Sequence, residues 1–278
     1  MPDAQINLPV FTPRYWEFLT DDEPPEGDLA EDYHEASKFY RGTMGRAVTR
    51  QRLESDEVLR RSSAIGAREL PHLPRLPLAP VDPEHEQQAA PALIRRPSCR
   101  DFAPQPLPVE QLGRALWLSY GAYQDRIPDS PAHRRPVASG GGLYPLELYL
   151  VADVTGSGRK GLYHYYVHDH VLEEVRAEVT TEELRELGAQ PDLVAAAPAI
   201  VLINGLFWRN RFKYRLRGYR FALLEAGAVI QQLTLVAQSF GWGVVPFAGL
   251  YDDVVERLCE IDGVDESFLN AVFLGLPE

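Results

Sequence analysis

Apolar positions recur at helical spacing in two long segments of the chain. The first follows Pro108 and ends near Gly121. The second covers about residues 218–240 and carries a broad apolar stripe, which predicts a central, well-buried helix. Shorter helices are expected behind the capping-box sequence at residues 180–183 and over residues 252–259.

Short runs of β-branched and aromatic residues predict the strands. They are expected at residues 146–151, 163–167, 171–175, 199–204, 244–247 and 268–274. The sequence His168-Asp169-His170 turns the second of these runs into the third as a hairpin. Because strands and helices do not alternate strictly, a doubly wound parallel sheet is disfavoured and an α+β core is expected.

Proline separates the first third of the chain from the rest. Fifteen of the 23 prolines lie at or before Pro108, and residues 70–80 carry one at every third position, a spacing that suits polyproline II. Residues 15–37 contain no Lys or Arg, and residues 21–35 contain eight acids, which predicts a solvated, extended face or, alternatively, a receptor for a basic peptide. We expect a proline-rich acidic extension over residues 1–90 and a folded domain over residues 91–278.

The overall charge of the chain bears on whether it binds nucleic acid. The 278 residues include 28 Lys and Arg against 40 Asp and Glu, a net charge of −12, which argues against nucleic acid as a partner. Two cysteines far apart in the sequence provide neither a disulfide framework nor a zinc-binding pair. No uninterrupted apolar stretch approaches the length of about 20 residues that spans a bilayer, and no signal sequence opens the chain. We therefore expect a cytoplasmic protein without a membrane segment.

Two polar motifs are candidate ligand sites. His164, His168 and His170 lie on a strand and its turn, where they share no face as histidines four apart on a helix would, so we expect no metal site. The sequence Ser139-Gly140-Gly141-Gly142 lacks the lysine and hydroxyl of a phosphate loop. It is either a flexible turn or a place where the backbone closely approaches a planar ligand.

Basic residues gather in two segments of this acidic chain. Residues 95–102 contain Arg95, Arg96 and Arg100 beside the hydroxyl of Ser98; they suit a phosphate or carboxylate ligand, or form a surface salt-bridge cluster. Residues 213–220 contain four more cations immediately before the long predicted helix. Cations oppose the dipole at a helix N-terminus, so their position indicates an anionic or electron-rich ligand.

A series of motifs resembles a known family. They are Arg96-x-Ser98-x-Arg100-x-Phe102, Leu116-Trp117 before Gly121, Ser139-x-Gly141-x-Leu143-Tyr144-Pro145-x-Glu147-x-Tyr149, Gly161-Leu162-Tyr163-His164-Tyr165, Lys213-Tyr214, Arg217-x-Tyr219-Arg220 and Glu225-x-Gly227-x3-Gln231. Together they resemble the SagB-type thiazole/oxazole dehydrogenases, which are FMN-dependent members of the nitroreductase superfamily. The resemblance covers about residues 94–275, and residues 33–38 of the extension also look typical.

The resemblance implies an α+β, nitroreductase-like fold. A central, mostly antiparallel sheet is flanked by helices, and two chains form an intimate homodimer that holds two FMN molecules at its interface. In the family, the R-x-S-x-R segment binds the FMN phosphate and ribityl chain, which implies these roles for Arg96, Ser98 and Arg100. The C-terminus lacks the basic residues that often complete such a phosphate site, and we expect Arg95 to replace them.

The same resemblance implies how the flavin ring is surrounded. A turn from the partner subunit lies against the ring and maps to Ser139, Gly140 and Gly142. The segment after the long helix contacts the ring edge through its backbone and maps to Pro246, Phe247, Ala248 and Gly249. The catalytic pair of the family maps to Lys213 and Tyr214.

The implied reaction is the oxidation of an azoline ring in a peptide to an azole, with dioxygen reoxidising the flavin. The substrate would be a free or carrier-bound peptide, and a cyclodehydratase is a possible partner. Two other classes stay open: a flavin oxidoreductase of the same fold that uses NAD(P)H, and a non-catalytic peptide-binding subunit of a peptide-modifying complex.

Overall fold

A computed structural model describes residues 29–41, 57, 97–123 and 134–278 of the chain. The predictions for the acids before residue 29, for the proline-rich segment 70–80, and for Arg95 and Arg96 lie outside the described residues. Residues up to Phe39 and from Arg96 onward belong to one compact unit, and residues 40–95 to another. The sheet and the helices around it belong to the first unit.

The first unit is built on a sheet of six strands in the order β3-β2-β1-β4-β6-β5. The strands are β1 (Leu146–Ala152), β2 (Gly161–Tyr166), β3 (Val171–Arg176), β4 (Ala199–Leu206), β5 (Gly243–Phe247) and β6 (Glu266–Gly275). All five neighbouring pairs are antiparallel. The predicted strands are therefore confirmed, each within two residues at either end, and so is the antiparallel arrangement.

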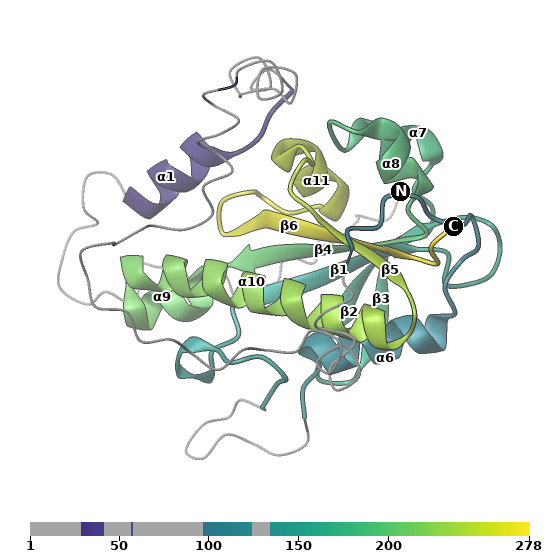
Figure 1. Ribbon diagram of the computed structural model, residues 1–278. Coiled ribbons are helices and arrows are strands. Elements are labelled where there is room, and N and C mark those ends of the chain that lie inside the picture. The colour runs from purple at the N-terminus through teal and green to yellow at the C-terminus, as the bar shows by residue number, and fades with distance from the viewer. Residues whose placement is uncertain (1–28, 42–56, 58–96, 124–133) are drawn as a thin grey trace, which may run out of the picture. The chain divides into compact units, whose positions relative to one another are not determined.

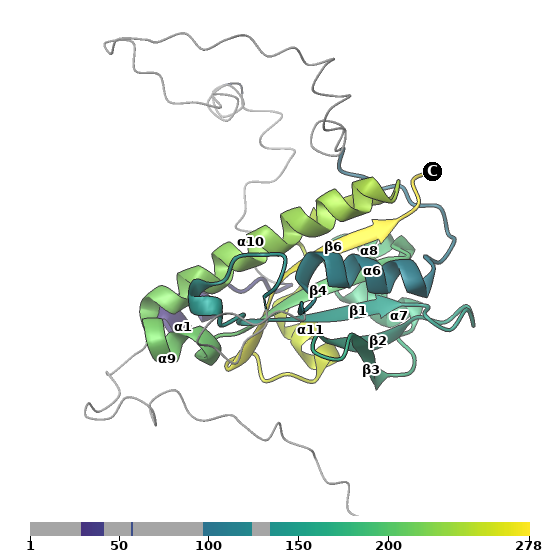
Figure 2. The ribbon, with the colours of Figure 1, turned by 90° about the horizontal axis from the view of Figure 1, so that it is seen from below.

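Helices cover both faces of this sheet (Figures 1 and 2). On one face, α6 (Val109–Tyr120) and α10 (Leu216–Ser239) enclose an apolar core that includes Leu116, Leu148 and Leu233. On the other face lie α7 (Thr181–Glu186), α8 (Pro191–Ala196) and α11 (Asp252–Cys259) over a second core. The predicted capping box is present at the start of α7, where the side chains and backbones of Thr180 and Glu183 exchange hydrogen bonds.

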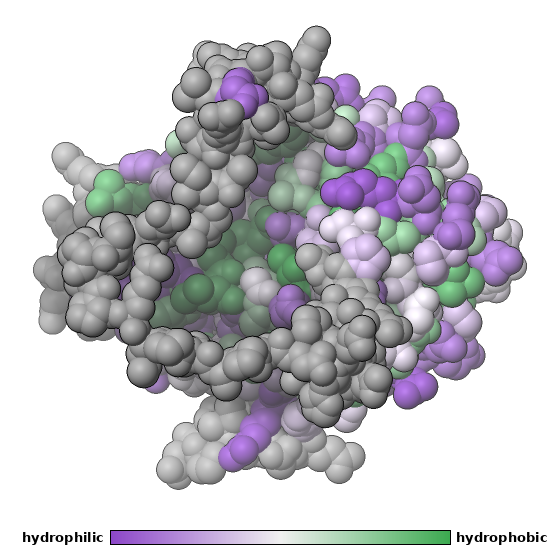
Figure 3. All heavy atoms as spheres, in the orientation of Figure 1, coloured by the Kyte–Doolittle hydropathy of each residue, from purple (hydrophilic) through white to green (hydrophobic). Residues whose placement is uncertain are grey.

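The burial predicted for α10 is only half right. Ala222, Val229 and Leu233 face the core and are almost fully buried, whereas 40% of Leu223 and 71% of Leu224 are exposed. Apolar side chains gather on the surface over this helix in the view of Figure 3. Within the described residues α10 alone is long and apolar enough to cross a membrane by length and composition, but one of its faces packs on the sheet. The other face presents exposed apolar side chains.

Three helices were not predicted, among them the short helix α8 named above. The helix α1 (Leu29–Ser37) lies in the stretch expected to be an extended face, and it packs on the folded domain through Ala30. The helix α9 (Trp208–Tyr214) immediately precedes α10. Both helices are shorter than ten residues, and isolated helices of this length are marginal in water. Tertiary packing therefore decides that these two segments are helical.

Candidate functional site

The segment Pro97–Arg100 runs along the start of β5 with alternating side chains. The Cys99 amide donates to the Val244 carbonyl at 3.1 Å, and the Cys99 side chain packs against Gly243. Because successive side chains of an extended segment point in opposite directions, Ser98 and Arg100 face outward, and both are exposed. The described half of the predicted phosphate site therefore presents a hydroxyl and a guanidinium to an anion.

At the end of β5, mainly backbone atoms are exposed to a possible ligand. Phe247 is buried, and its ring lies 4.8 Å from that of Phe273. Ala248 is exposed, while the Gly249 carbonyl accepts a hydrogen bond from the Ala189 amide at 2.9 Å. Of this predicted ring-edge segment, Pro246 to Gly249, the exposed parts are therefore the main chain around Ala248 and its small side chain.

The glycine sequence forms one ordered turn of 3-10 helix, Gly140–Gly142. Gly141 and Gly142 have φ values of 65° and 66°, a region that residues with a Cβ adopt at a cost. The Ser139 hydroxyl accepts a hydrogen bond from the Tyr144 amide at 2.8 Å, which closes the turn. The turn is thus held in a defined shape that favours glycine.

The predicted catalytic pair lies directly against this turn. A Cβ placed on Gly141 would be 2.6 Å from the Tyr214 hydroxyl and 3.1 Å from the Lys213 Nζ. The Lys213 ammonium lies 5.3 Å from the centre of the Tyr214 ring, and Phe221 meets that ring edge-on at 5.0 Å. The fold therefore brings the glycine turn and the Lys-Tyr pair, which are distant in sequence, into contact.

Lys213 and Tyr214 lie immediately before α10, as predicted, but the helix-dipole argument for them does not hold. Lys213 and Tyr214 end the preceding helix α9, where a cation is favoured by the helix dipole. The dipole of α10 instead opposes Arg217 and Arg220, which lie in the first turns of that helix and are exposed. Contact with the glycine turn is what supports Lys213 and Tyr214 as the catalytic pair.

A buried polar cluster supports the turn from behind. The Tyr120 hydroxyl donates to Glu225 at 2.7 Å and accepts from the Leu146 amide at 3.2 Å. The Arg135 guanidinium lies 4.5 Å from the centres of both the Tyr120 and Tyr144 rings. Burial raises the pKa of Glu225, and hydrogen bonds from Ser139 and Tyr120 oppose this rise. Neither Tyr120 nor Arg135 was expected to be a site residue from the sequence.

A polar cleft of about 690 Å³ opens beside the same turn and is lined in part by Gly142, Glu147, His164 and Arg209. His164 lies between two carboxylates, 3.0 Å from Glu147 and 2.8 Å from Glu173. Burial lowers the pKa of His164, but the hydrogen bonds to these carboxylates outweigh it and raise the pKa to about 9. The imidazole is therefore positively charged at neutral pH, and it is one of the groups that line the cleft.

The other two histidines of the motif, His168 and His170, are not part of this ionic cluster. His170 contacts the Tyr165 hydroxyl at 2.8 Å, and His168 packs against the Tyr166 ring. Within the described residues no group of three His, Cys, Asp or Glu side chains is placed to hold a metal ion. One signal in the sequence could have indicated the ionic cluster: Glu147 is a charged residue inside an otherwise apolar strand.

The predicted site residues form two groups at opposite ends of α10. Ser98 and Arg100 lie beside Val244, just after that helix ends, whereas Lys213 and Tyr214 come just before it begins. The helix has 24 residues and is therefore about 36 Å long. A single chain keeps the two groups too far apart to contact one ring system together.

Most of the folded domain matches one known protein family. The model of the nitroreductase family matches residues 93–275, which contain the whole sheet and both groups of site residues described above. This chain belongs to the nitroreductase family. The nitroreductase-like fold expected from the motifs is therefore confirmed.

Two curated relatives and one solved structure place the chain within the nitroreductase family. A protein of Methanocaldococcus jannaschii described as a nitroreductase is 31% identical over 170 residues, 61% of this chain and 82% of that protein. The microcin B17-processing protein McbC of Escherichia coli is 35% identical over 153 residues, 53% of this chain. The chain spans 56% of the length of McbC in that match.

The solved structure is the E. coli microcin synthetase McbBCD complex with truncated pro-MccB17 bound. A chain of it matches with a TM-score of 0.68 and 25% identity, over 90% of this chain and 92% of that one. These similarities confirm the resemblance that the motifs indicated, since they relate this nitroreductase-family chain to a microcin-processing protein. The roles of the individual site residues stay predictions.

Proposed function

We propose that this chain is an FMN-dependent dehydrogenase that oxidises azoline rings in a peptide to azoles, with dioxygen as the final electron acceptor. The observation that carries the proposal is the contact of Lys213 and Tyr214 with the glycine turn at Gly141. This contact puts a phenol hydroxyl and an ammonium at the backbone where a planar ring can approach most closely. The similarity to McbC and to the McbBCD complex supports a peptide substrate and a cyclodehydratase partner.

The residues of the predicted phosphate site fit FMN. Ser98 and Arg100 are exposed and point away from the core, as a phosphate site requires. Arg95 and Arg96 would add two cations to them. Together these side chains would offset the charge of a phosphate in a chain that is otherwise acidic.

The segments predicted to surround the ring fit FMN as well. The open backbone around Ala248 would meet the ring edge, with Pro246, Phe247 and Gly249 fixing its course. In the glycine turn, a Cβ on Gly140 would come within 2.8 Å of the Phe221 ring, and one on Gly141 would collide with Tyr214. The turn therefore packs against Phe221 and Tyr214 in this way only as glycine.

The distance between the two groups of site residues supports a homodimer. A two-fold dimer built on the outer face of α10 would bring Ser139, Gly142 and Lys213 of one chain to the phosphate-binding segment of the other. Leu224 is exposed on that face, and among the described residues no atom from outside the helix backbone lies within 4 Å of a Cβ placed on Gly227. The face is thus apolar and open, as an interface between two copies requires. We further propose that this dimer acts in the cytoplasm.

The reaction removes two electrons and two protons from the azoline ring. Bound FMN would accept the hydride. The task of the protein is then to hold the azoline ring over the glycine turn and to take the remaining ring proton. We assign this role to Tyr214, whose hydroxyl contacts Gly141, with the Lys213 ammonium beside its ring.

The test is single-turnover reduction of the bound flavin by an azoline peptide. The protein should purify yellow with FMN, and the parent flavin should bleach under anaerobic conditions. Lys213→Ala and Tyr214→Phe should keep the flavin and slow its reduction by about 10²–10⁴, the contribution of a positioned general base. Arg185→Ala, at an exposed site on α7, is the matched control for removal of a cation.

Three results would contradict parts of this proposal. Colourless protein that takes up no added FMN would favour the non-catalytic peptide-binding subunit. Rapid steady-state oxidation of NAD(P)H without reaction of the azoline peptide would favour a nicotinamide-dependent flavin enzyme. Parent-like flavin reduction by both variants would show that the base is another group or water.

A further inference from the structure

The helix α1 reaches the turn that carries the proposed catalytic pair. It lies before residue 93 and thus outside the segment that the family model matches. Ala30 of α1 nevertheless packs in one apolar cluster with Phe207, Tyr219 and Ala222. Phe207 precedes α9, and the other two residues belong to α10. An element beyond the shared domain is therefore in contact with both helices that flank the turn after Lys213 and Tyr214.

The turn between α9 and α10 is strained. Arg215 has φ 49° and ψ −135°, a conformation that a residue with a Cβ keeps only when its surroundings impose it. Local bonds contribute: the Arg215 amide donates to the Arg211 carbonyl at 2.7 Å, and the Asn210 side chain donates to the Gly218 carbonyl at 2.9 Å. A Cβ on Gly218 would lie 2.9 Å from Arg211 Cα, so the two helices meet at backbone distance.

Side chains of α1 hold both sides of this turn. Glu31 forms an ion pair with Arg211 of α9 at 3.2 Å, and the Arg211 side chain is only 4% exposed. His34 Nδ1 lies 3.0 Å from the Tyr219 hydroxyl of α10, in a buried hydrogen bond. The His34 ring also meets the Phe207 ring edge-on at 5.2 Å. The helix α1 therefore links α9 to α10 across the strained residue between them.

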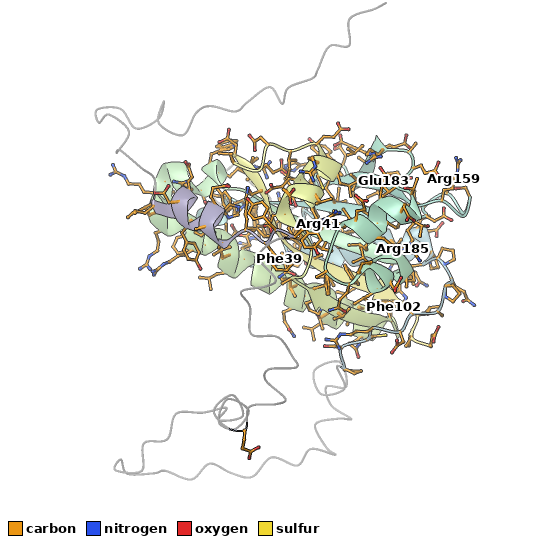
Figure 4. The ribbon with its side chains drawn as sticks, turned by 90° about the horizontal axis from the view of Figure 1, so that it is seen from above. Phe39, Arg41, Phe102, Arg159, Glu183 and Arg185 are labelled. Carbon is orange, nitrogen blue, oxygen red and sulfur yellow. The ribbon has the colours of Figure 1, made fainter. Side chains whose placement is uncertain are left out.

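The far end of α1 is tied to the rest of the domain. The Lys38 ammonium donates to the Gly263 carbonyl at 2.6 Å and pairs with Glu256 of α11 at 3.2 Å. Phe39 and Asp252 exchange two hydrogen bonds, at 2.8 and 3.1 Å, where the chain leaving α1 meets the start of α11 (Figure 4). These ties prevent α1 from moving together with the turn. A loosened turn would have to break the contacts of Glu31 and His34.

We propose that α1 is a brace for the α9–α10 turn, and that Glu31, His34 and Tyr219 are positioning residues for Lys213 and Tyr214. The mechanical part of this proposal is that the backbone from residue 213 to residue 218 keeps its shape because α1 is docked. The chemical part concerns the proton transfer assigned to the Lys-Tyr pair, and it therefore rests on the proposed function. The mechanical part is independent of that function.

The mechanical part is tested by hydrogen exchange of backbone amides in the full-length, flavin-loaded protein. Tyr219→Phe removes one hydroxyl and keeps the ring, and Glu31→Gln removes one charge and keeps the shape. Each should speed exchange at residues 213–218 about tenfold, the effect of losing one buried hydrogen bond or ion pair, and leave the strands β1 and β4 unchanged. Asp32→Asn is the matched control, since Asp32 is an exposed acid on the same helix. Unchanged exchange at residues 213–218 in both variants would overturn the brace.

The positioning role is tested by a double-mutant cycle in single-turnover flavin reduction. Tyr219→Phe should slow the parent about tenfold and have no further effect when Lys213→Ala and Tyr214→Phe are already present, because the pair it positions is gone. His34→Ala should behave like Tyr219→Phe, and His34→Asn, which keeps a hydrogen-bonding group, should recover part of the rate. An equal loss in both backgrounds would show a general structural role and refute positioning. If the parent flavin is not reduced by the peptide, the proposed function fails, while the exchange measurement still decides the brace.

Discussion

Replacing Gly141 by alanine tests whether the contact between the glycine turn and Tyr214 matters for catalysis. A Cβ at this position would lie 2.6 Å from the Tyr214 hydroxyl, and ordinary contact begins at 3.4 Å. The hydroxyl therefore has to retreat by about 0.8 Å. A misplacement of about 1 Å in a reacting group costs up to about 100-fold in rate, so Gly141→Ala should slow flavin reduction by about 10- to 100-fold.

The effect on stability should be much smaller and separable. Gly141 has φ 65°, where an alanine costs about 1 kcal/mol, and the clashing atom is the end of a side chain that can turn away. We expect a fall in Tm of about 2–4 °C. Gly156→Ala is the matched control, because Gly156 has φ 69° and a Cβ placed there meets no atom within 4 Å in the described part of the chain beyond its two neighbours. It should lose the same stability and keep the parent rate.

Differential scanning calorimetry and anaerobic stopped-flow reduction of the flavin separate the two effects. We expect similar Tm values for the two variants and a rate loss in Gly141→Ala alone. If Gly141→Ala reduces its flavin as fast as Gly156→Ala, the hydroxyl of Tyr214 does not act from its place on the glycine turn, and the base is a group elsewhere in the site.

Flavin affinity, dimer formation and pH dependence can be tested in the same protein. Arg100→Ala should weaken FMN binding about 10- to 100-fold in fluorescence titration, whereas Arg159→Ala, which removes an exposed guanidinium paired with Glu178, should not; equal losses would remove Arg100 from the phosphate site. Leu224→Glu should convert the dimer to monomers in size-exclusion chromatography without lowering the Tm, since this side chain is 71% exposed in the single chain; a persistent dimer would mean that another face joins the chains. Because the pKa of His164 is raised from 6.5 to about 9, its ion pairs should stabilise the fold fully below pH 6.5, and this contribution, on the order of 3 kcal/mol, should be lost as the pH rises through 9; urea unfolding at pH 6 and pH 9.5 should show the loss in the parent and not in His164→Gln.

The regular elements of the domain could be predicted because their sequences carry long, consistent patterns. The strand β1 is an almost unbroken run of apolar residues, and α10 repeats its buried positions over 24 residues. The helices α1 and α9 carry no such pattern. The acids of α1 suggest a solvated segment, and the contacts of Ala30 and His34 with distant residues make it a docked helix.

Some features of the candidate site could likewise be predicted from the sequence, and others could not. Its residue types are visible in the sequence, because a glycine run or a cluster of arginines is unusual at any position. Their arrangement is not, since the contact between Gly141 and Tyr214 depends on how α9 packs against the turn. The cluster of Glu147, His164 and Glu173 requires the register of three strands, in which His164 faces Glu173 directly.

The placement of the two groups of site residues at opposite ends of α10 has a genetic consequence. In the proposed dimer each flavin would take its arginines from one chain and its Lys-Tyr pair from the other. Where FMN is too scarce to fill the weakened site, a chain with Arg100→Ala would be nearly inactive alone, as would a chain with Lys213→Ala. A mixed dimer would nevertheless contain one site with both defects and one site with none. Co-expression of the two defective genes would therefore restore about a quarter of the parent activity under random assortment. Selection then acts on the pair of chains, and an allele that is null when alone can be masked by a different null allele in the same cell.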